Sequence, residues 1–234
     1  MGSAMPKNRL WTFAVIAIAI CSTAPVARAD WDGVSETRDA AVYGSDAVFH
    51  RNTAAFPQWT DVMRRAAQEL RAKHVCASAV DSGCVPAEWR ALIDSITGLP
   101  LMAKLETVNR TFNAQPYVTA SQNWHRPSYW ETPFEFLAHG GQCEDYAIAK
   151  YLALRAAGVG DDSLHVLIVR DTDLGVDHAV LLADVGGRSY LLDNLDPRIL
   201  PAAMVTQYRP YYAINQSGYW TYFGGRSMFA AGRG

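Results

Sequence analysis

The chain has 234 residues, of which 50% are hydrophobic and 19% are charged, and its formal net charge is −2. These values are ordinary for a globular protein with enough residues for one good core. The mild acidity argues against nucleic acid as a partner, because phosphate binding requires a basic face.

Residues 1–29 have the pattern of a secretory signal peptide. Lys7 and Arg9 precede an apolar run over residues 10–20, and residues 27–29 (Ala-Arg-Ala) fit the small-x-small cleavage pattern. The run is shorter than the roughly 20 residues that span a bilayer. We expect cleavage after this segment, export to the periplasm and no stable membrane insertion afterwards; an uncleaved N-terminal anchor is the alternative.

The mature chain is predicted to consist of an irregular lead-in over residues 30–54 and one domain over residues 55–234. Near the start of this domain, apolar side chains recur at helical spacing in three places. The predicted helices run from about Trp59 to Leu70, from Pro86 to Thr97 and from Leu101 to Asn113.

The cysteines between the first two predicted helices have the spacing of a disulfide. Cys76 and Cys84 flank the turn signal Asp81-Ser82-Gly83, and two such cysteines pair in an oxidising compartment. Cys21 is removed with the signal peptide, so Cys143 is left over as a free thiol. Neither a Cys-x-x-Cys motif nor a paired-histidine spacing supports the alternative of a zinc site.

Two further helices are predicted in immediate succession. Thr132 is a cap and Pro133 the first residue of a short helix, which Gly140 and Gly141 end. The next helix runs from about Cys143 to Ala157. We expect the two glycines to allow a tight turn and to leave space for a substrate backbone.

The remaining sequence is rich in β-branched and aromatic residues and predicts strands. Three strands are expected over residues 164–170, 177–185 and 189–193, with a hairpin turn at Gly186-Gly187 between the last two. The aromatic stretch over residues 208–223 predicts one or two more antiparallel strands. The order of helices followed by a meander indicates an α+β domain whose helices pack on one face of an antiparallel sheet.

The position of Cys143 favours nucleophilic chemistry. The free N–H groups and the dipole of a helix N-terminus stabilise a thiolate, and a neighbouring imidazolium lowers the thiol pKa further. We therefore expect a lowered thiol pKa, and the backbone N–H of Cys143 is expected to help hold an oxyanion. Glu144 and Asp145 are interpreted as first-turn acids that complement the helix dipole.

The expected base is His178, which begins a predicted strand after a long loop. Around the Gly-Gly turn, residues whose numbers sum to about 372 should pair, which places Asp193 roughly opposite His178. An aspartate there would fix the tautomer of the imidazole. Each residue alone has a plainer interpretation, as a core cysteine, a strand histidine and a strand-end aspartate; only their conjunction predicts a Cys143-His178-Asp193 triad.

This conjunction resembles the bacterial transglutaminase-like cysteine proteinases, the LapG-like group. The resemblance lies in residues 140–152 (Gly-Gly-Gln-Cys-Glu-Asp-Tyr-Ala-Ile-Ala-Lys-Tyr-Leu), 177–181 (Asp-His-Ala-Val-Leu), 192–194 (Leu-Asp-Asn) and 129–136 (Tyr-Trp-Glu-Thr-Pro-Phe-Glu-Phe). It extends over roughly residues 55–225. It implies a papain-like fold of the transglutaminase type, with Cys143 as nucleophile, His178 as base and Asp193 as the orienting acid.

The resemblance also implies a reaction and partners. Such enzymes hydrolyse a peptide bond of an envelope or surface protein through a thioester acyl-enzyme. Family members trim large surface adhesins near a di-alanine, and an inner-membrane receptor for cyclic di-GMP holds them inactive. Two alternatives stay open: an amide-transferring enzyme of the transglutaminase or amidase type with the same triad, and a non-catalytic binding module of the same fold.

The sequence departs from the family pattern at one position. The family usually has an aspartate directly before the cysteine, which binds calcium together with the glutamate after it. Gln142 stands at this position, while Glu144 and Asp145 match the remaining acids. Calcium prefers several charged oxygen ligands, and the amide removes one charge. We therefore expect no required cofactor, with calcium at Glu144 and Asp145 as the alternative.

Overall fold

The structure, a computed structural model, describes residues 45–77 and 83–223. The predicted signal peptide lies outside them, and the division of the chain into lead-in and domain stays a prediction. The described helices are α1 (Pro57–Glu69), α2 (Ala87–Ile96), α3 (Leu101–Asn113), α4 (Ala120–Trp124), α5 (Pro133–His139) and α6 (Cys143–Ala156), with short 3-10 turns η2 (Thr53–Ala55), η3 (Asp161–Ser163) and η4 (Ala202–Met204). None of the described helices has the length and apolar character needed to cross a membrane.

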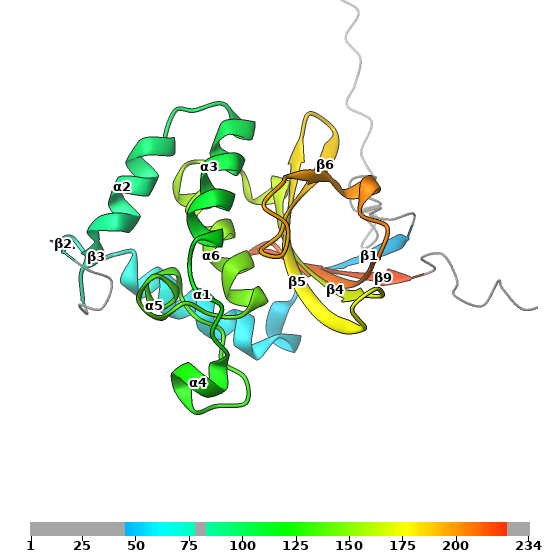
Figure 1. Cartoon of the computed structure of the whole chain (residues 1–234), viewed down its shortest axis with the longest axis horizontal. Coiled ribbons are helices and arrows are strands. Elements are labelled where there is room, and N and C mark those ends of the chain that lie inside the picture. The colour runs from blue at the N-terminus through cyan, green and yellow to red at the C-terminus, as the bar shows by residue number, and fades with distance from the viewer. Residues whose placement is uncertain (1–44, 78–82, 224–234) are drawn as a thin grey trace, which may run out of the picture. The chain divides into compact units, whose positions relative to one another are not determined.

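Seven strands form one antiparallel sheet in the order β1-β9-β8-β4-β5-β6-β7. They are β1 (Asp46–His50), β4 (Leu164–Asp171), β5 (Val176–Val185), β6 (Arg188–Leu192), β7 (Leu200–Pro201), β8 (Tyr208–Ile214) and β9 (Tyr219–Phe223). The described helices gather on one side of this sheet (Figure 1). The predicted α+β class and the helix positions are confirmed.

The helix α6 lies at the centre of the packing, between β5 and β4 on one side and α3 and α5 on the other. Every side chain from Asp145 to Leu154 is buried. A helix with neighbours on both sides buries its whole circumference and not a single apolar stripe. The short helix α5 next to it begins as predicted: the Thr132 hydroxyl oxygen accepts from the Glu135 N–H at 3.2 Å, and the Glu135 carboxylate accepts from the Thr132 N–H at 2.8 Å.

A second apolar cluster covers the other face of the sheet. It joins side chains from β4, β5 and β6 to Tyr208 on β8 and to Ala202 and Val205 of the connection before it. This connection, drawn in orange, follows β6 in Figure 1. The sheet is thus buried on both faces, which explains why β4 and β5 read as nearly continuous apolar runs.

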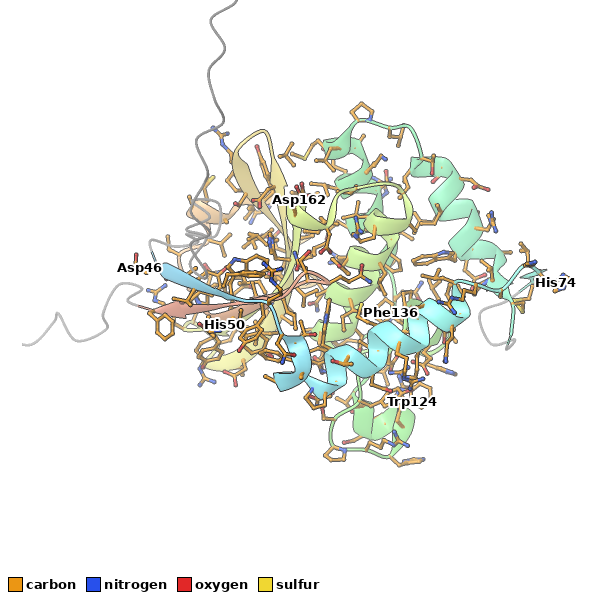
Figure 2. The ribbon with its side chains drawn as sticks, turned by 180° about the vertical axis from the view of Figure 1, so that it is seen from behind. Asp46, His50, His74, Trp124, Phe136 and Asp162 are labelled. Atoms are coloured by element: carbon orange, nitrogen blue, oxygen red, sulfur yellow. A yellow bond between two sulfur atoms is a disulfide. The ribbon has the colours of Figure 1, made fainter. Side chains whose placement is uncertain are left out.

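The expectation of an irregular lead-in is wrong for residues 46–50, which form the edge strand β1 beside β9. Figure 2 shows this strand from behind, between its labelled ends Asp46 and His50. The His50 Nε2 lies 3.1 Å from the Thr221 Oγ1, and the imidazole stacks on Tyr219. Because this pairing depends on residues far along the chain, the local sequence pattern does not reveal it.

The simple meander is also wrong beyond β7. The strand β8 returns to pair with β4 instead of β7, and β9 follows it outward. In the β5–β6 hairpin, Leu181 pairs with Leu192, so the paired numbers sum to 373 and not to 372. Asp193 therefore lies just past the end of β6.

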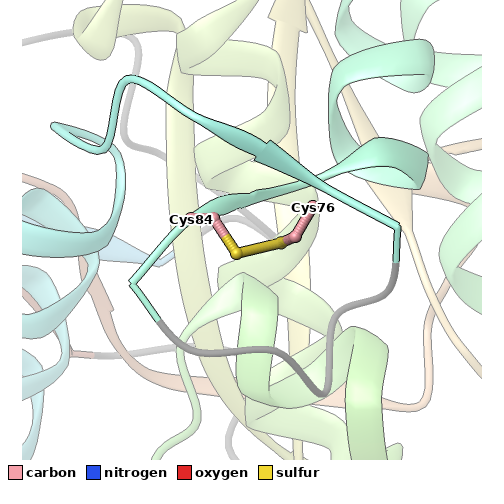
Figure 3. The surroundings of a disulfide bond; sticks show 2 residues. All are labelled: Cys76 and Cys84. Atoms are coloured by element: carbon pink, nitrogen blue, oxygen red, sulfur yellow. A yellow bond between two sulfur atoms is a disulfide. The ribbon is translucent and has the colours of Figure 1, made fainter.

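The predicted disulfide between Cys76 and Cys84 is present, with a Cα–Cα distance of 5.7 Å. It lies beside the short parallel pair β2 (Val75–Cys76) and β3 (Val85–Pro86) (Figure 3). Within the described residues, Cys143 is the one free cysteine.

Candidate active site

The first turn of α6 is fixed by Asp145, which lies two residues after Cys143 and is buried. One carboxylate oxygen accepts from the Gln142 backbone N–H at 2.8 Å, and the other accepts from the Glu131 N–H at 2.7 Å. Burial, followed by the neighbouring Glu144 carboxylate, raises the pKa of Asp145 well above its usual range. The helix start is thereby tied to the segment before α5, and Cys143 stands at the helix N-terminus as predicted.

The two glycines before α6 are expected from the sequence to leave space for a substrate backbone, but they make room for another segment of the protein. Gly140 has a φ of +71°, and a Cβ there would lie 2.3 Å from the Pro116 carbonyl oxygen. Gly141 forms a parallel bridge with Tyr117, and its carbonyl oxygen accepts from the Val118 N–H at 3.0 Å. The space that the glycines leave is thus filled by the protein's own residues 116–118 and not by a substrate backbone.

The predicted partner pair is formed. The His178 Nε2 lies 2.9 Å from the Asp193 Oδ1, although Asp193 lies beyond the end of β6. Both side chains are buried, at 5% and 6% exposure. Because a carboxylate accepts the hydrogen bond, the proton is assigned to Nε2, which leaves Nδ1 as the nitrogen able to take a proton from a thiol.

Asp193 is held as a carboxylate by several donors. The Tyr208 hydroxyl donates to the Oδ2 at 2.5 Å, and the Leu195 N–H donates to the Oδ1 at 2.9 Å. Burial by itself would raise the pKa of Asp193, but the hydrogen bonds from His178, Tyr208 and Leu195 keep it below its ordinary value. The Asn113 amide also donates to the Asp193 backbone carbonyl at 2.7 Å, which anchors this turn to α3.

The thiol of Cys143 lies next to the His178 segment. The backbone N–H of Ala179, the residue after His178, faces the sulfur, and the Glu144 Oε2 lies 3.3 Å from it. Burial and the Glu144 carboxylate raise the pKa of Cys143 to about 12, against the opposing effect of the two backbone N–H groups. The expectation of a lowered thiol pKa is therefore wrong for this arrangement, because burial and the Glu144 carboxylate both disfavour the thiolate.

The side chain of Gln142 connects two segments beside the thiol. Its Oε1 accepts from the Ala120 N–H at 3.0 Å, and its Nε2 donates to the Glu144 Oε1 at 2.8 Å. The predicted calcium ligands Glu144 and Asp145 thus have their oxygens engaged in hydrogen bonds. In the part of the chain that the structure describes, no group of three or more His, Cys, Asp or Glu side chains is arranged to hold a metal ion.

Three residues of the site carry no sequence signal that reveals them. Tyr208 belongs to an aromatic stretch that reads as core, and only the fold brings it to Asp193. Tyr117 precedes α4 and is 58% exposed; burial, followed by the charge of Cys143, raises its pKa. Lys150 reads as a solvated helix residue, yet it is fully buried and its Nζ lacks a hydrogen-bond partner.

A cavity of about 310 Å³ lies on the other side of Asp193. Asp193 and Tyr208 line it together with Leu174, Leu195 and Val205, but Cys143 and His178 do not. The cavity therefore reaches the carboxylate side of the pair and not the thiol.

A free thiol at a helix N-terminus lies next to the strand segment that carries a histidine bonded to a carboxylate, an arrangement typical of papain-like thiol hydrolases. A model of the family described as bacterial transglutaminase-like cysteine proteinase matches residues 73–226. The chain therefore belongs to this family, and it is a cysteine peptidase that acts on proteins.

Solved structures of LapG from Legionella pneumophila resemble the chain. The calcium-bound form is 36% identical with a TM-score of 0.53, over 57% of this chain and 76% of that one. An EGTA-treated form is 34% identical with a TM-score of 0.51, over 57% and 74%. No curated protein matches the chain.

Proposed function

We propose that the protein hydrolyses a peptide bond through a Cys143-His178-Asp193 triad. The 2.9 Å hydrogen bond between His178 and Asp193, with the Cys143 thiol against the backbone that follows His178, is the observation that supports it best. His178 takes the thiol proton on Nδ1 and passes it to the leaving amine. Asp193 keeps the imidazole in the required tautomer and stabilises the imidazolium.

The thiolate of Cys143 attacks the peptide carbonyl and forms a tetrahedral intermediate. The backbone N–H of Cys143, in the first turn of α6, is placed to donate to its oxyanion. Collapse of this intermediate releases the amine product and leaves a thioester, which a water molecule activated by His178 then hydrolyses. Membership of a proteinase family favours water over an amine as the final acceptor.

We further propose that the enzyme acts in the periplasm on an envelope or surface protein. The signal-peptide pattern of residues 1–29 supports export, and the Cys76–Cys84 disulfide is of the kind that persists in oxidising compartments. A large surface adhesin as substrate and an inner-membrane cyclic di-GMP receptor as inhibitor follow from the family resemblance alone.

Comparative proteomics of the cell envelope and medium tests this function. Cells that carry the wild type are compared with cells that carry Cys143→Ala. We expect at least one envelope or surface protein to be shortened only in the wild-type cells. Identical protein lengths in both strains, with the enzyme present and exported, would contradict the proposal.

The calcium of the Legionella relative does not fit the residues of this chain. Calcium takes 6–8 oxygen ligands. Of the residues around the first turn of α6, Gln142 directs an N–H donor at Glu144, and both oxygens of Asp145 accept from backbone N–H groups. The proposed reaction therefore involves no metal ion.

A further inference from the structure

The Glu144 carboxylate beside the thiol accepts a hydrogen bond from a side-chain amide. The Gln142 side chain lies between the Glu144 carboxylate and the first residue of α4. The orientation of this amide is determined by its surroundings: the Ala120 N–H can only donate, so the atom that faces it must be the oxygen. The Nε2 group therefore points at Glu144.

Each carboxylate oxygen in the first turn of α6 already has a donor. The Glu144 Oε1 accepts from Gln142 at 2.8 Å, and the Oε2 accepts from the Cys143 thiol at 3.3 Å. The two oxygens of Asp145 accept from the backbone N–H groups of Gln142 and Glu131. Each of these oxygens therefore already has one positively polarised partner.

A third acid nearby, Glu131, is engaged through one of its oxygens, while its Oε2 is buried and has no hydrogen-bond partner. The Glu131 Oε1 accepts from the Asn123 amide at 3.0 Å and from the Trp124 indole N–H at 2.6 Å. Both donors belong to α4, the helix whose first N–H is bonded to Gln142. Gln142 therefore connects α4 to the start of α6, and Glu131 connects α4 to the segment before α5.

We infer that the Gln142 amide takes the place of a bound cation, so that the first turn of α6 is organised without calcium. The side-chain N–H group of Gln142 donates to the Glu144 carboxylate, and its amide oxygen accepts from the backbone N–H of Ala120 in α4. Gln142 is in this sense a positioning residue: it touches Glu144, which in turn touches the nucleophile. Replacing the amide by a carboxylate of the same length removes the donor and places two acids side by side, which is the oxygen-rich arrangement that calcium binds.

Thermal unfolding of the purified protein in calcium and in EGTA tests this inference. We expect the melting temperature of the wild type to differ by less than about 1 °C between 1 mM calcium chloride and 1 mM EGTA. Gln142→Glu is expected to melt lower than the wild type in EGTA, and calcium should raise its melting temperature by roughly 3 °C or more, through binding to the folded state. Gln68→Glu adds the same charge on the exposed face of α1 and should show no calcium response.

A calcium-dependent rise in the wild type would overturn the inference, and so would a Gln142→Glu variant that responds to calcium no more than Gln68→Glu does. If Gln142→Glu fails to fold in both buffers, the wild-type measurement decides alone: calcium independence supports the inference and calcium dependence refutes it. The measurement reads stability and not hydrolysis, so its outcome is independent of the proposed peptidase reaction.

Discussion

The two halves of the proposed triad are prepared to different degrees. On the imidazole side, Asp193 accepts three hydrogen bonds and its pKa is kept below the ordinary value, so His178 is held with Nδ1 available. On the thiol side, burial and the Glu144 carboxylate raise the pKa of Cys143 to about 12. The base is thus ready in the resting structure, while the nucleophile is stored as a thiol. In the proposed reaction, the thiol proton passes from the Glu144 contact to His178.

Removing the base should reduce the rate of hydrolysis more than any change to the residues that contact the triad. His178→Gln deletes the proton acceptor, and we expect hydrolysis of the substrate identified by proteomics to fall by roughly 10³–10⁴-fold. His74→Gln, which changes an exposed histidine, is the matched control. A loss smaller than tenfold in His178→Gln would show that another group accepts the thiol proton.

Removing the carboxylate beside the thiol should make Cys143 easier to ionise, so that the nucleophile is prepared as well as the base. Glu144→Gln deletes the charge that raises the pKa of Cys143, so a larger fraction of thiolate is expected at any pH below that pKa. We expect iodoacetamide to alkylate Cys143 roughly tenfold faster at pH 8, since one pKa unit changes the thiolate fraction about tenfold. Glu106→Gln on the exposed face of α3 serves as the control. An unchanged or slower rate in Glu144→Gln would refute this role of the carboxylate.

Weakening the imidazole side should have a smaller effect. Tyr208→Phe keeps the ring but removes one of the donors to Asp193, and kcat/KM is expected to fall about 5- to 10-fold, as for the loss of one hydrogen bond to a charged group. The matched control on the same strand is Tyr211→Phe, whose exposed hydroxyl donates to Asp177. If both variants lose activity equally, the Tyr208 bond contributes nothing specific to the triad.

The buried Lys150 should affect how the stability of the protein depends on pH. Burial lowers the pKa of Lys150 to about 7, against the opposing charge of Asp193. Between about pH 7 and its ordinary value of 10.5, the unfolded chain carries a proton on Lys150 that the folded chain lacks, so the stability from this group rises with pH. Lys150→Met should flatten that rise, which is at most about 1.4 kcal/mol per pH unit. It should also raise the free energy of unfolding at pH 7 by roughly 1–4 kcal/mol.

Urea unfolding at pH 7, 8 and 9 measures the Lys150 effect, with the exposed Lys73→Met as the control. Parallel pH dependences for the wild type and Lys150→Met would show that Lys150 stays protonated in the folded protein.

Features that depend on local periodicity were predictable from the sequence. The predicted helix from Leu101 to Asn113 coincides with α3, and the Thr132 cap and the Gly186-Gly187 hairpin are present. The His178–Asp193 contact was also predictable, because the observed pairing sum of 373 differs by two from the sum of these residues, and a shift of two positions keeps side chains on the same face.

Features that depend on distant partners were not predictable. The edge strand β1 exists because β9 offers it a partner, and Lys150 is buried because helices pack around α6. The effect of Glu144 on Cys143 depends on a side-chain rotamer at the helix start. Helix position alone predicts a lowered thiol pKa, whereas burial, followed by the neighbouring Glu144 carboxylate, raises the pKa of Cys143.

The most direct test of the central claim is the rate at which purified wild type and Cys143→Ala cleave the same purified substrate. We expect cleavage by the wild type, and no product above the background without enzyme from a folded Cys143→Ala with the wild-type melting temperature. Cleavage by Cys143→Ala at a rate within tenfold of the wild type would contradict Cys143 as the nucleophile.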